Sequence, residues 1–203
     1  MRLLFKIDTR DYDTNGNAFT RPSVRSIIIR DGKVGMVHSQ KYHYYKFPGG
    51  GIKFGESQTE TLIRETREEA GLLIIPDSIR EYGYVYRIQK GKHEAVFAQE
   101  NYYYICDAAS EVVPQQLDDY EAKEQFTLEF VNPQTAIAVN RNEDHGPTDQ
   151  IMLEREAHVL ELLIQDGHLK NDCQHFGFRD QTGRKQLLFT RFFCMQRKGK
   201  QGG

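Results

Sequence analysis

The sequence has few cysteines and no long apolar run. Only three cysteines occur among its 203 residues, and no two of them form a CxxC pair. This argues against a disulfide framework and a cysteine-based zinc site, and we expect a reducing, cytoplasmic location. No apolar run approaches the length needed to span a membrane, so no membrane partner is expected. The first residues acquire charge too soon for a secretory signal.

A formal net charge of only −2 conceals an uneven distribution. Residues 168–203 carry eight Lys or Arg and two Asp or Glu, whereas residues 1–167 carry 19 basic and 27 acidic side chains. A basic end on an acidic body could contact nucleic acid or could simply be solvated. We predict one domain over 1–167 and a basic C-terminal extension over 168–203, either a hairpin or a mobile tail.

Apolar patterning and turn residues predict a layered domain with strands before and after a central helix. Strands are expected at 24–30, 34–39, 43–47, 81–89, 94–108 and 127–131. Asp31-Gly32 favours a tight hairpin turn. Helices are expected from a capping box at Ser57 to Gly71, after Asn132-Pro133, and from a Thr148 cap to Gly167. The order indicates an α/β (α+β) fold, a mixed sheet covered by helices.

The central helix is densely acidic on one face. Successive helical residues turn by about 100°, so Glu65, Glu68 and Glu69 share roughly one third of the circumference. Like charges at this spacing repel each other unless something compensates for them. Leu62 and Thr66 fall on an adjoining arc that should pack on the sheet, which would hold the acidic face at the edge of the core.

A bound cation is one way to compensate for this repulsion. Three carboxylates on a rigid face suit a hard divalent ion such as Mg²⁺. Such an ion would also allow an anionic substrate to approach an acidic surface. The glycines before the helix would let backbone come close to it, and Glu56 and Arg64 could orient the ligands. The alternative is an acidic helix that is merely solvated.

The spacing of these residues matches a known signature, G-x5-E-x7-R-E-U-x-E-E-x-G-U, in which U is aliphatic. The fixed positions are occupied by Gly50, Glu56, Arg64, Glu65, Glu68, Glu69, Gly71 and Leu72. One position departs, because Thr66 replaces an aliphatic residue. We expect its hydroxyl to bond the carbonyl one turn back. The sequence therefore resembles the Nudix hydrolase family.

The resemblance implies an α/β/α sandwich around a mixed β-sheet and a metal-dependent pyrophosphohydrolase. Such enzymes cleave the diphosphate of a nucleoside diphosphate linked to another group, such as ADP-ribose, by attack of water, with Mg²⁺ or Mn²⁺. Glu69 would be the firmest metal ligand, Glu65 a ligand or the base, and Glu68 a further ligand. The Gly49 carbonyl would join the metal shell. By the same resemblance, Glu56 and Arg64 would hold the geometry.

Further site residues are expected outside the signature. Family members often add an acid from a distal loop, and among Asp118, Asp119, Glu121 and Glu124 we favour Glu121 as base or ligand. The alternative is a solvated acidic loop. Arg25, Lys46 and Lys53 are candidates to bind substrate phosphates, or are ordinary surface residues. The aromatic residues at 42–47 and 102–104 could stack a base or belong to the core.

Three functions remain open. The leading one is turnover of a small nucleotide substrate. A second is a Nudix-fold regulator that senses a nucleotide or binds nucleic acid without turnover. A third is pyrophosphohydrolysis of RNA 5′ ends. Family members often pair, which leaves a homodimer open as well.

Overall fold

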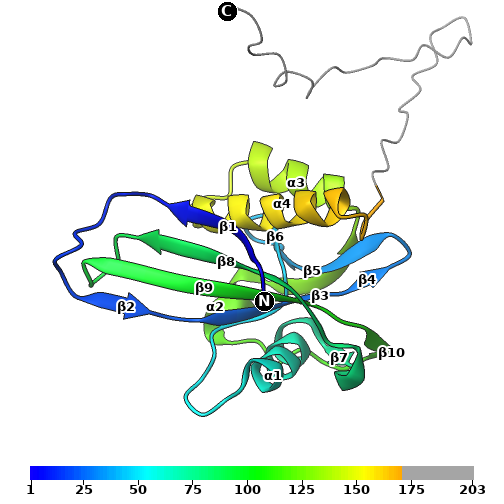
Figure 1. Cartoon of the computed structure of the whole chain (residues 1–203). Helices are drawn as coiled ribbons and strands as arrows, with labels where there is room; N and C mark the ends of the chain where they lie inside the picture. The colour runs from blue at the N-terminus through cyan, green and yellow to red at the C-terminus, as the bar shows by residue number, and fades with distance from the viewer. Residues whose placement is uncertain (171–203) are drawn as a thin grey trace, which may run out of the picture. The chain divides into compact units, whose positions relative to one another are not determined.

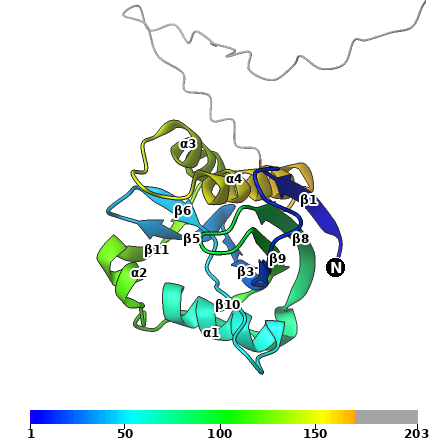
Figure 2. The same ribbon diagram turned by 90° about the vertical axis from the view of Figure 1, so that its left-hand side faces the viewer.

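The computed structural model describes residues 1–170, and its chain forms three layers with the sheets in the middle. Helices α3 and α4 lie on one side of the strands and α1 on the other (Figure 1). The end-on view shows the same sandwich, with α2 beside β11 (Figure 2). The predicted α/β/α sandwich is therefore confirmed. Most of the predicted extension at 168–203 lies outside the described residues, and its separate status stays a prediction.

Strands dominate the first third of the chain, and most of the helical segments come late. The strands are β1 Leu3–Asp8, β2 Ala18–Thr20, β3 Ser23–Ile27, β4 Ile29–Arg30, β5 Lys33–Ser39, β6 Tyr44–Lys46, β7 Leu72–Ile74, β8 Arg80–Gln89, β9 Val96–Ile105, β10 Ala108–Val112 and β11 Phe126–Val131. The helices are α1 Gln58–Ala70, α2 Asp119–Glu124, α3 Pro133–Asn142 and α4 Gln150–Gln165, with a 3₁₀ turn at Pro76–Ser78.

The largest sheet is mixed. Its strand order is β1-β8-β9-β2, and β3 also pairs with β9. The β8–β9 pair is antiparallel, whereas β1 runs parallel to β8, and both β2 and β3 run parallel to β9. A second sheet has the order β11-β5-β4 with β6 on β5, and β7 pairs with β10. The two layers of helices bury two apolar clusters against these strands.

The predicted hairpin is present with one interruption. Asp31 and Gly32 both have positive φ, 50° and 75°, which suits a type I′ turn between β4 and β5. The single strand expected over 24–30 is divided at Ile28 into β3 and β4, which belong to different sheets. This break lets one run of sequence contribute to both sheets.

Helix α1 begins and ends where its sequence predicts. Ser57 accepts from the Glu60 N–H and the Glu60 side chain reaches back, which completes the capping box. Gly71 caps the other end in the left-handed conformation.

The cap of α4 differs from the prediction. Asp149, not Thr148, accepts from the first free N–H groups of the helix. The Thr148 hydroxyl instead donates to the His145 carbonyl at 2.8 Å.

Several short elements were not predicted from the sequence. These are β1, β2, β7, β10 and α2, each of six residues or fewer. Short segments carry too few periods for a hydrophobic pattern to be read. In the part of the chain that the structure describes, no helix is long and apolar enough to cross a membrane.

Candidate active site

Arg64 is the centre of the acidic face of α1. Its guanidinium makes two 2.7 Å bonds to Glu56, one to each carboxylate oxygen. Its Nη1 also donates to Glu65 at 2.6 Å and to Glu68 at 3.0 Å. The fork geometry of arginine suits this bidentate contact. The Arg64 guanidinium therefore offsets the repulsion among three carboxylates and fixes their orientation.

Glu69 points to a different set of partners. Its Oε1 accepts from the Lys46 ammonium at 2.7 Å and its Oε2 from the Gly49 N–H at 2.9 Å. The Glu69 side chain is 3% exposed, whereas those of Glu65 and Glu68 are 15% and 32% exposed. Of these three signature acids, one is thus buried and two can be reached by solvent or a ligand.

The glycines before α1 are required by close approaches of the backbone. Gly49 has φ of 140°, and a Cβ there would lie 2.1 Å from the Val24 carbonyl oxygen. A Cβ on Gly50 would lie 2.3 Å from a carboxylate oxygen of Glu65. The missing side chain at Gly50 is therefore the space into which the Glu65 carboxylate fits.

Helix α2 brings a fifth carboxylate to the site. Glu121 is 4% exposed, and its side chain accepts from the Asp118 N–H and from the Tyr120 hydroxyl, each at 2.9 Å. Burial, a hydrogen bond with Glu69 and the Glu69 charge raise the pKa of the Glu121 carboxyl. The acid favoured from the sequence thus lies against the buried acid of the signature.

The three candidate phosphate ligands lie in different environments. Lys46 is buried and paired with Glu69, with its ammonium 4.5 Å from the centre of the Phe126 ring. Arg25 is half-buried and donates to the Gly49 carbonyl. Lys53 is exposed on the loop before α1. The suggestion that Lys46 is an ordinary surface residue is wrong, because its partner is an interior carboxylate.

Most of the aromatic residues offered as base-stacking candidates belong to the core. Tyr44, Tyr45, Phe47, Tyr103 and Tyr104 are all at most 7% exposed. An aromatic residue that the sequence did not single out lies at the site instead. Tyr120 is 53% exposed and bonds Glu121 through its hydroxyl. Its helix has only six residues, too short for a helical pattern to reveal.

Thr66, the one departure from the signature, is fully buried and has a different partner from the one predicted. Its hydroxyl lies 2.9 Å from the Ser26 hydroxyl on β3, not against the carbonyl one turn back. Thr66 therefore joins α1 to the sheet by a polar contact at a position where an aliphatic residue would give an apolar one.

The donor set suits a hard divalent cation. Glu69 and Glu121 are two interior carboxylates in contact, an arrangement that favours a proton or a cation between them. Glu65 and Glu68 add oxygen donors that are more open to solvent. Within residues 1–170, no three Asp, Glu, His or Cys side chains converge as a ready-made cage. Ligand binding would thus require these carboxylates to exchange part of their contacts with Arg64 and Lys46.

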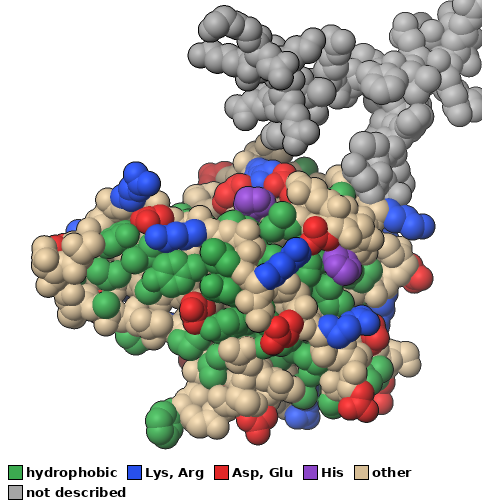
Figure 3. All heavy atoms as spheres, viewed as in Figure 1, with side chains coloured by type: hydrophobic (Ala, Val, Ile, Leu, Met, Phe, Trp, Pro, Cys, Tyr) green, Lys and Arg blue, Asp and Glu red, His purple; other side chains and the backbone are tan. Residues whose placement is uncertain are grey.

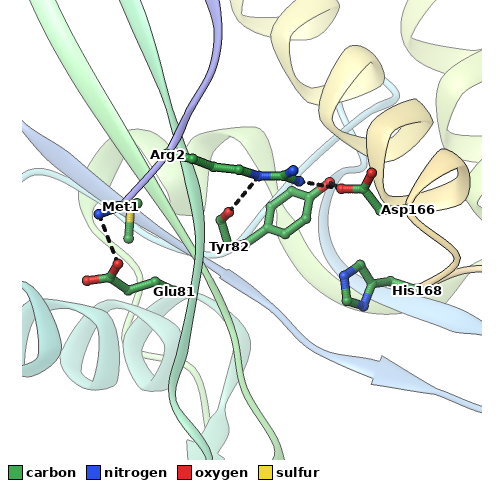
Figure 4. Close-up of a pocket in the computed structure, with 6 residues that line it drawn as sticks. All are labelled: Met1, Arg2, Glu81, Tyr82, Asp166 and His168. Carbon is green, nitrogen blue, oxygen red and sulfur yellow. Dashed lines mark hydrogen bonds and ion pairs between the residues drawn. The ribbon is translucent and has the colours of Figure 1, made fainter.

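Hollows on the described surface include one beside the acidic helix and one away from it. One, of about 330 Å³, lies along the outer side of α1 and is lined partly by Arg64 and Glu68. The other, of about 510 Å³, lies between the start of β1, β8 and the end of α4 (Figure 4). Its charged groups are already paired with each other, as in the Arg2–Asp166 and Met1–Glu81 contacts. It contains no residue of the signature.

The sequence comparison assigns the chain to a family. The NUDIX domain model matches residues 20–153, well over half of the chain. The chain therefore belongs to the Nudix hydrolase family.

The individual relatives are more distant. An RNA pyrophosphohydrolase of Acinetobacter baylyi is 44% identical over 54 residues, 26% of this chain, and the chain spans 32% of that relative's length. The MutT protein of Bacillus halodurans aligns with a TM-score of 0.49 at 18% identity, over 69% of this chain and 82% of its own. An ADP-ribose pyrophosphatase of Streptococcus suis aligns with a TM-score of 0.44 at 14% identity, over 74% and 93%.

Proposed function

We propose that this protein is a metal-dependent pyrophosphohydrolase of small nucleotides. Its substrate would be a nucleoside diphosphate linked to another group, such as ADP-ribose or a related nucleotide. The observation that carries the proposal is the complete set of signature acids gathered around Arg64 and Lys46, with Glu121 against Glu69.

Glu65, Glu68, Glu69 and the Gly49 carbonyl would hold Mg²⁺ or Mn²⁺. When bound, a divalent ion neutralises phosphate charge and lowers the pKa of a coordinated water. Arg64, through its contacts with Glu56, Glu65 and Glu68, would hold these acids in position toward the substrate. Arg25 and Lys53 would bind the outer phosphate oxygens, with Lys46 contributing once its hold on Glu69 loosens.

Glu121 would act as base, with Glu65 as the second candidate for that role. A raised pKa is what a carboxylate needs to accept a proton from water near neutral pH. Its position at the start of α2, fixed by the Asp118 N–H, would keep it within reach of the attacking water.

Pyrophosphohydrolysis of RNA 5′ ends is a second candidate. The 44% identity over 54 residues with an RNA pyrophosphohydrolase favours it, although that match covers a minority of both chains. Charged side chains of both signs are interspersed on the face seen in Figure 3, with no single-sign patch there among the described residues. A small substrate remains the first choice, because the RNA pyrophosphohydrolase match covers only 26% of this chain. Nucleic-acid binding without turnover, a homodimer and a cytoplasmic location stay open predictions.

A substrate panel tests the proposal. It contains ADP-ribose, dinucleoside polyphosphates, oxidised deoxynucleoside triphosphates and 5′-triphosphate RNA, each with Mg²⁺, Mn²⁺ or a chelator. We expect metal-dependent release of nucleoside monophosphate products from at least one small nucleotide, and its loss in Glu69→Gln. Preference for the 5′-triphosphate RNA would favour the second candidate. If no compound is hydrolysed, or Glu69→Gln retains full turnover, the proposal is wrong.

A further inference from the structure

Helix α4 buries a charged pair against the sheets. Arg155 and Glu156 are 2% and 0% exposed, and the Arg155 Nε lies 3.0 Å from the Glu156 carboxylate. Burying an ion pair costs desolvation energy, and well-packed apolar residues in its place are often no less stable. Stability of the fold alone is thus a weak reason for this pair. Its other contacts indicate what else it does.

Each member of the pair reaches a segment next to the glycine loop, residues 49–51. The second carboxylate oxygen of Glu156 accepts from the Phe47 N–H at 3.1 Å. Arg155 donates from Nη1 to the Asn101 side-chain oxygen at 2.7 Å, and the Ser23 hydroxyl donates to the same oxygen at 2.8 Å. Glu156 therefore contacts the chain directly before the loop, whereas Arg155 is linked through the Asn101 side chain to Ser23.

These contacts hold both ends of the same five residues. Phe47 begins the segment, and Gly51 at its end forms an isolated β-bridge with Ser23. Between them lies Gly49, whose N–H bonds Glu69 and whose carbonyl accepts from Arg25. Gly50 follows, with its α-carbon against the Glu65 carboxylate. A shift of this segment would move the Gly49 N–H that bonds Glu69 and the Gly50 backbone that lies against Glu65.

We propose that Arg155 and Glu156 are positioning residues for the segment 47–51. They hold this segment so that the Gly49 backbone lies against the carboxylates of α1. This rests on the proposed metal-dependent function. Neither side chain touches the substrate site directly, so both act through the backbone that they hold. A fully buried pair suits this role because its side chains have no solvent to exchange with and its contacts persist.

The test compares paired substitutions on α4. Arg155→Met with Glu156→Leu removes both charges together and should leave a folded protein. We expect Mn²⁺ binding, followed by electron paramagnetic resonance, to weaken by about tenfold, the usual size of an indirect effect on metal ligands. We expect kcat to fall with little change in KM, and amide exchange to speed up over residues 47–51.

Two further variants make the result decisive. Ser23→Ala removes the hydroxyl that shares the Asn101 oxygen with Arg155. It should give the same changes at a smaller magnitude. Glu161 lies on the same helix and forms an exposed ion pair with Arg141. Glu161→Gln should leave all three readouts unchanged. Wild-type Mn²⁺ affinity and exchange in the double variant would overturn the proposal. If the wild-type protein hydrolyses nothing, the proposed function fails, and the exchange of residues 47–51 still decides whether the pair holds the loop.

Discussion

The ammonium group of Lys46 lies 2.7 Å from the Glu69 carboxylate, and both side chains are almost completely removed from solvent. An interior lysine thus supplies positive charge at the acid that we expect to bind metal most firmly. Arg64 does the same for Glu65 and Glu68 at the more open part of the helix. The acidic face is therefore compensated within the protein, and a divalent cation would compete for carboxylates that already have partners.

Replacing the buried lysine should destabilise the protein in a metal-dependent way. Lys46→Met removes the cation from the buried Glu69 carboxylate, which keeps its contacts with the Gly49 N–H and Glu121. We expect a loss of about 3 kcal/mol in the free energy of unfolding. The loss should shrink when Mn²⁺ is added, because the ion can take over the charge. Urea unfolding with chelator and with Mn²⁺ measures both values. Lys53→Met is the exposed control, and an equal loss under both conditions would contradict the account.

Filling the space beside Glu65 should impair turnover more than folding. In Gly50→Ala, the new Cβ would lie 2.3 Å from a carboxylate oxygen, so the Glu65 side chain must move. We expect kcat/KM to fall by about tenfold or more, as displacement of a ligand or of its supporting contacts does. Gly51→Ala is the matched control, because the atoms nearest to its Cβ belong to the end of the flexible Arg21 side chain. Equal activities of the two variants would show that the Glu65 position is unimportant.

Replacing Thr66, the one residue that departs from the signature, with an aliphatic residue should change the free energy of unfolding little. Thr66→Val removes a donor to Ser26, but the Ser26 hydroxyl keeps its own contact with the Pro48 carbonyl at 3.3 Å. The cost of one lost hydrogen bond is about 1 kcal/mol and is partly offset by the apolar surface gained. Chemical unfolding of Thr66→Val, Ser26→Ala and the double variant measures the coupling. A loss above about 3 kcal/mol would mean that the pair matters more than one net hydrogen bond.

The Glu56–Arg64 pair should make the metal-free protein sensitive to acid. The Arg64 guanidinium lowers the pKa of Glu56 to about 2 from its ordinary 4.5. A carboxyl whose pKa is depressed by folding contributes stability above the unfolded value and loses it as pH falls through the folded one. The stability difference between wild type and Glu56→Gln should therefore be full above pH 4.5 and disappear toward pH 2. A difference that is independent of pH in this range would contradict the assignment.

The parts of the fold that local sequence determines were predictable. The capping box at Ser57 and the Gly71 stop set the bounds of α1, and Asp31-Gly32 set the hairpin. The placement of Glu121 beside Glu69 could only be suggested, because it depends on how α2 packs. Short strands such as β1 gain their conformation from pairing with β8, and their own sequence specifies it weakly.

Two features of the site lay beyond sequence reasoning. The helical angles placed Glu69 with Glu65 on one face, but packing turns Glu69 into the interior toward Lys46. The Arg155–Glu156 pair gives no local signal, because adjacent charged residues on an amphipathic helix usually face solvent. Only the assembled core shows that both are buried and that Glu156 contacts Phe47.

The most direct test of the central claim is the steady-state rate of phosphoanhydride hydrolysis by Glu68→Gln and Arg67→Gln, two neighbouring substitutions on α1. Glu68 carries a partly exposed signature carboxylate bonded to Arg64, whereas Arg67 is exposed and outside that cluster. We predict that Glu68→Gln lowers Mg²⁺-dependent kcat/KM by about 10²-fold or more, with an unchanged unfolding midpoint, and that Arg67→Gln retains wild-type turnover. Equal turnover by the two variants on the best substrate would contradict the assignment of this helix face as the catalytic site.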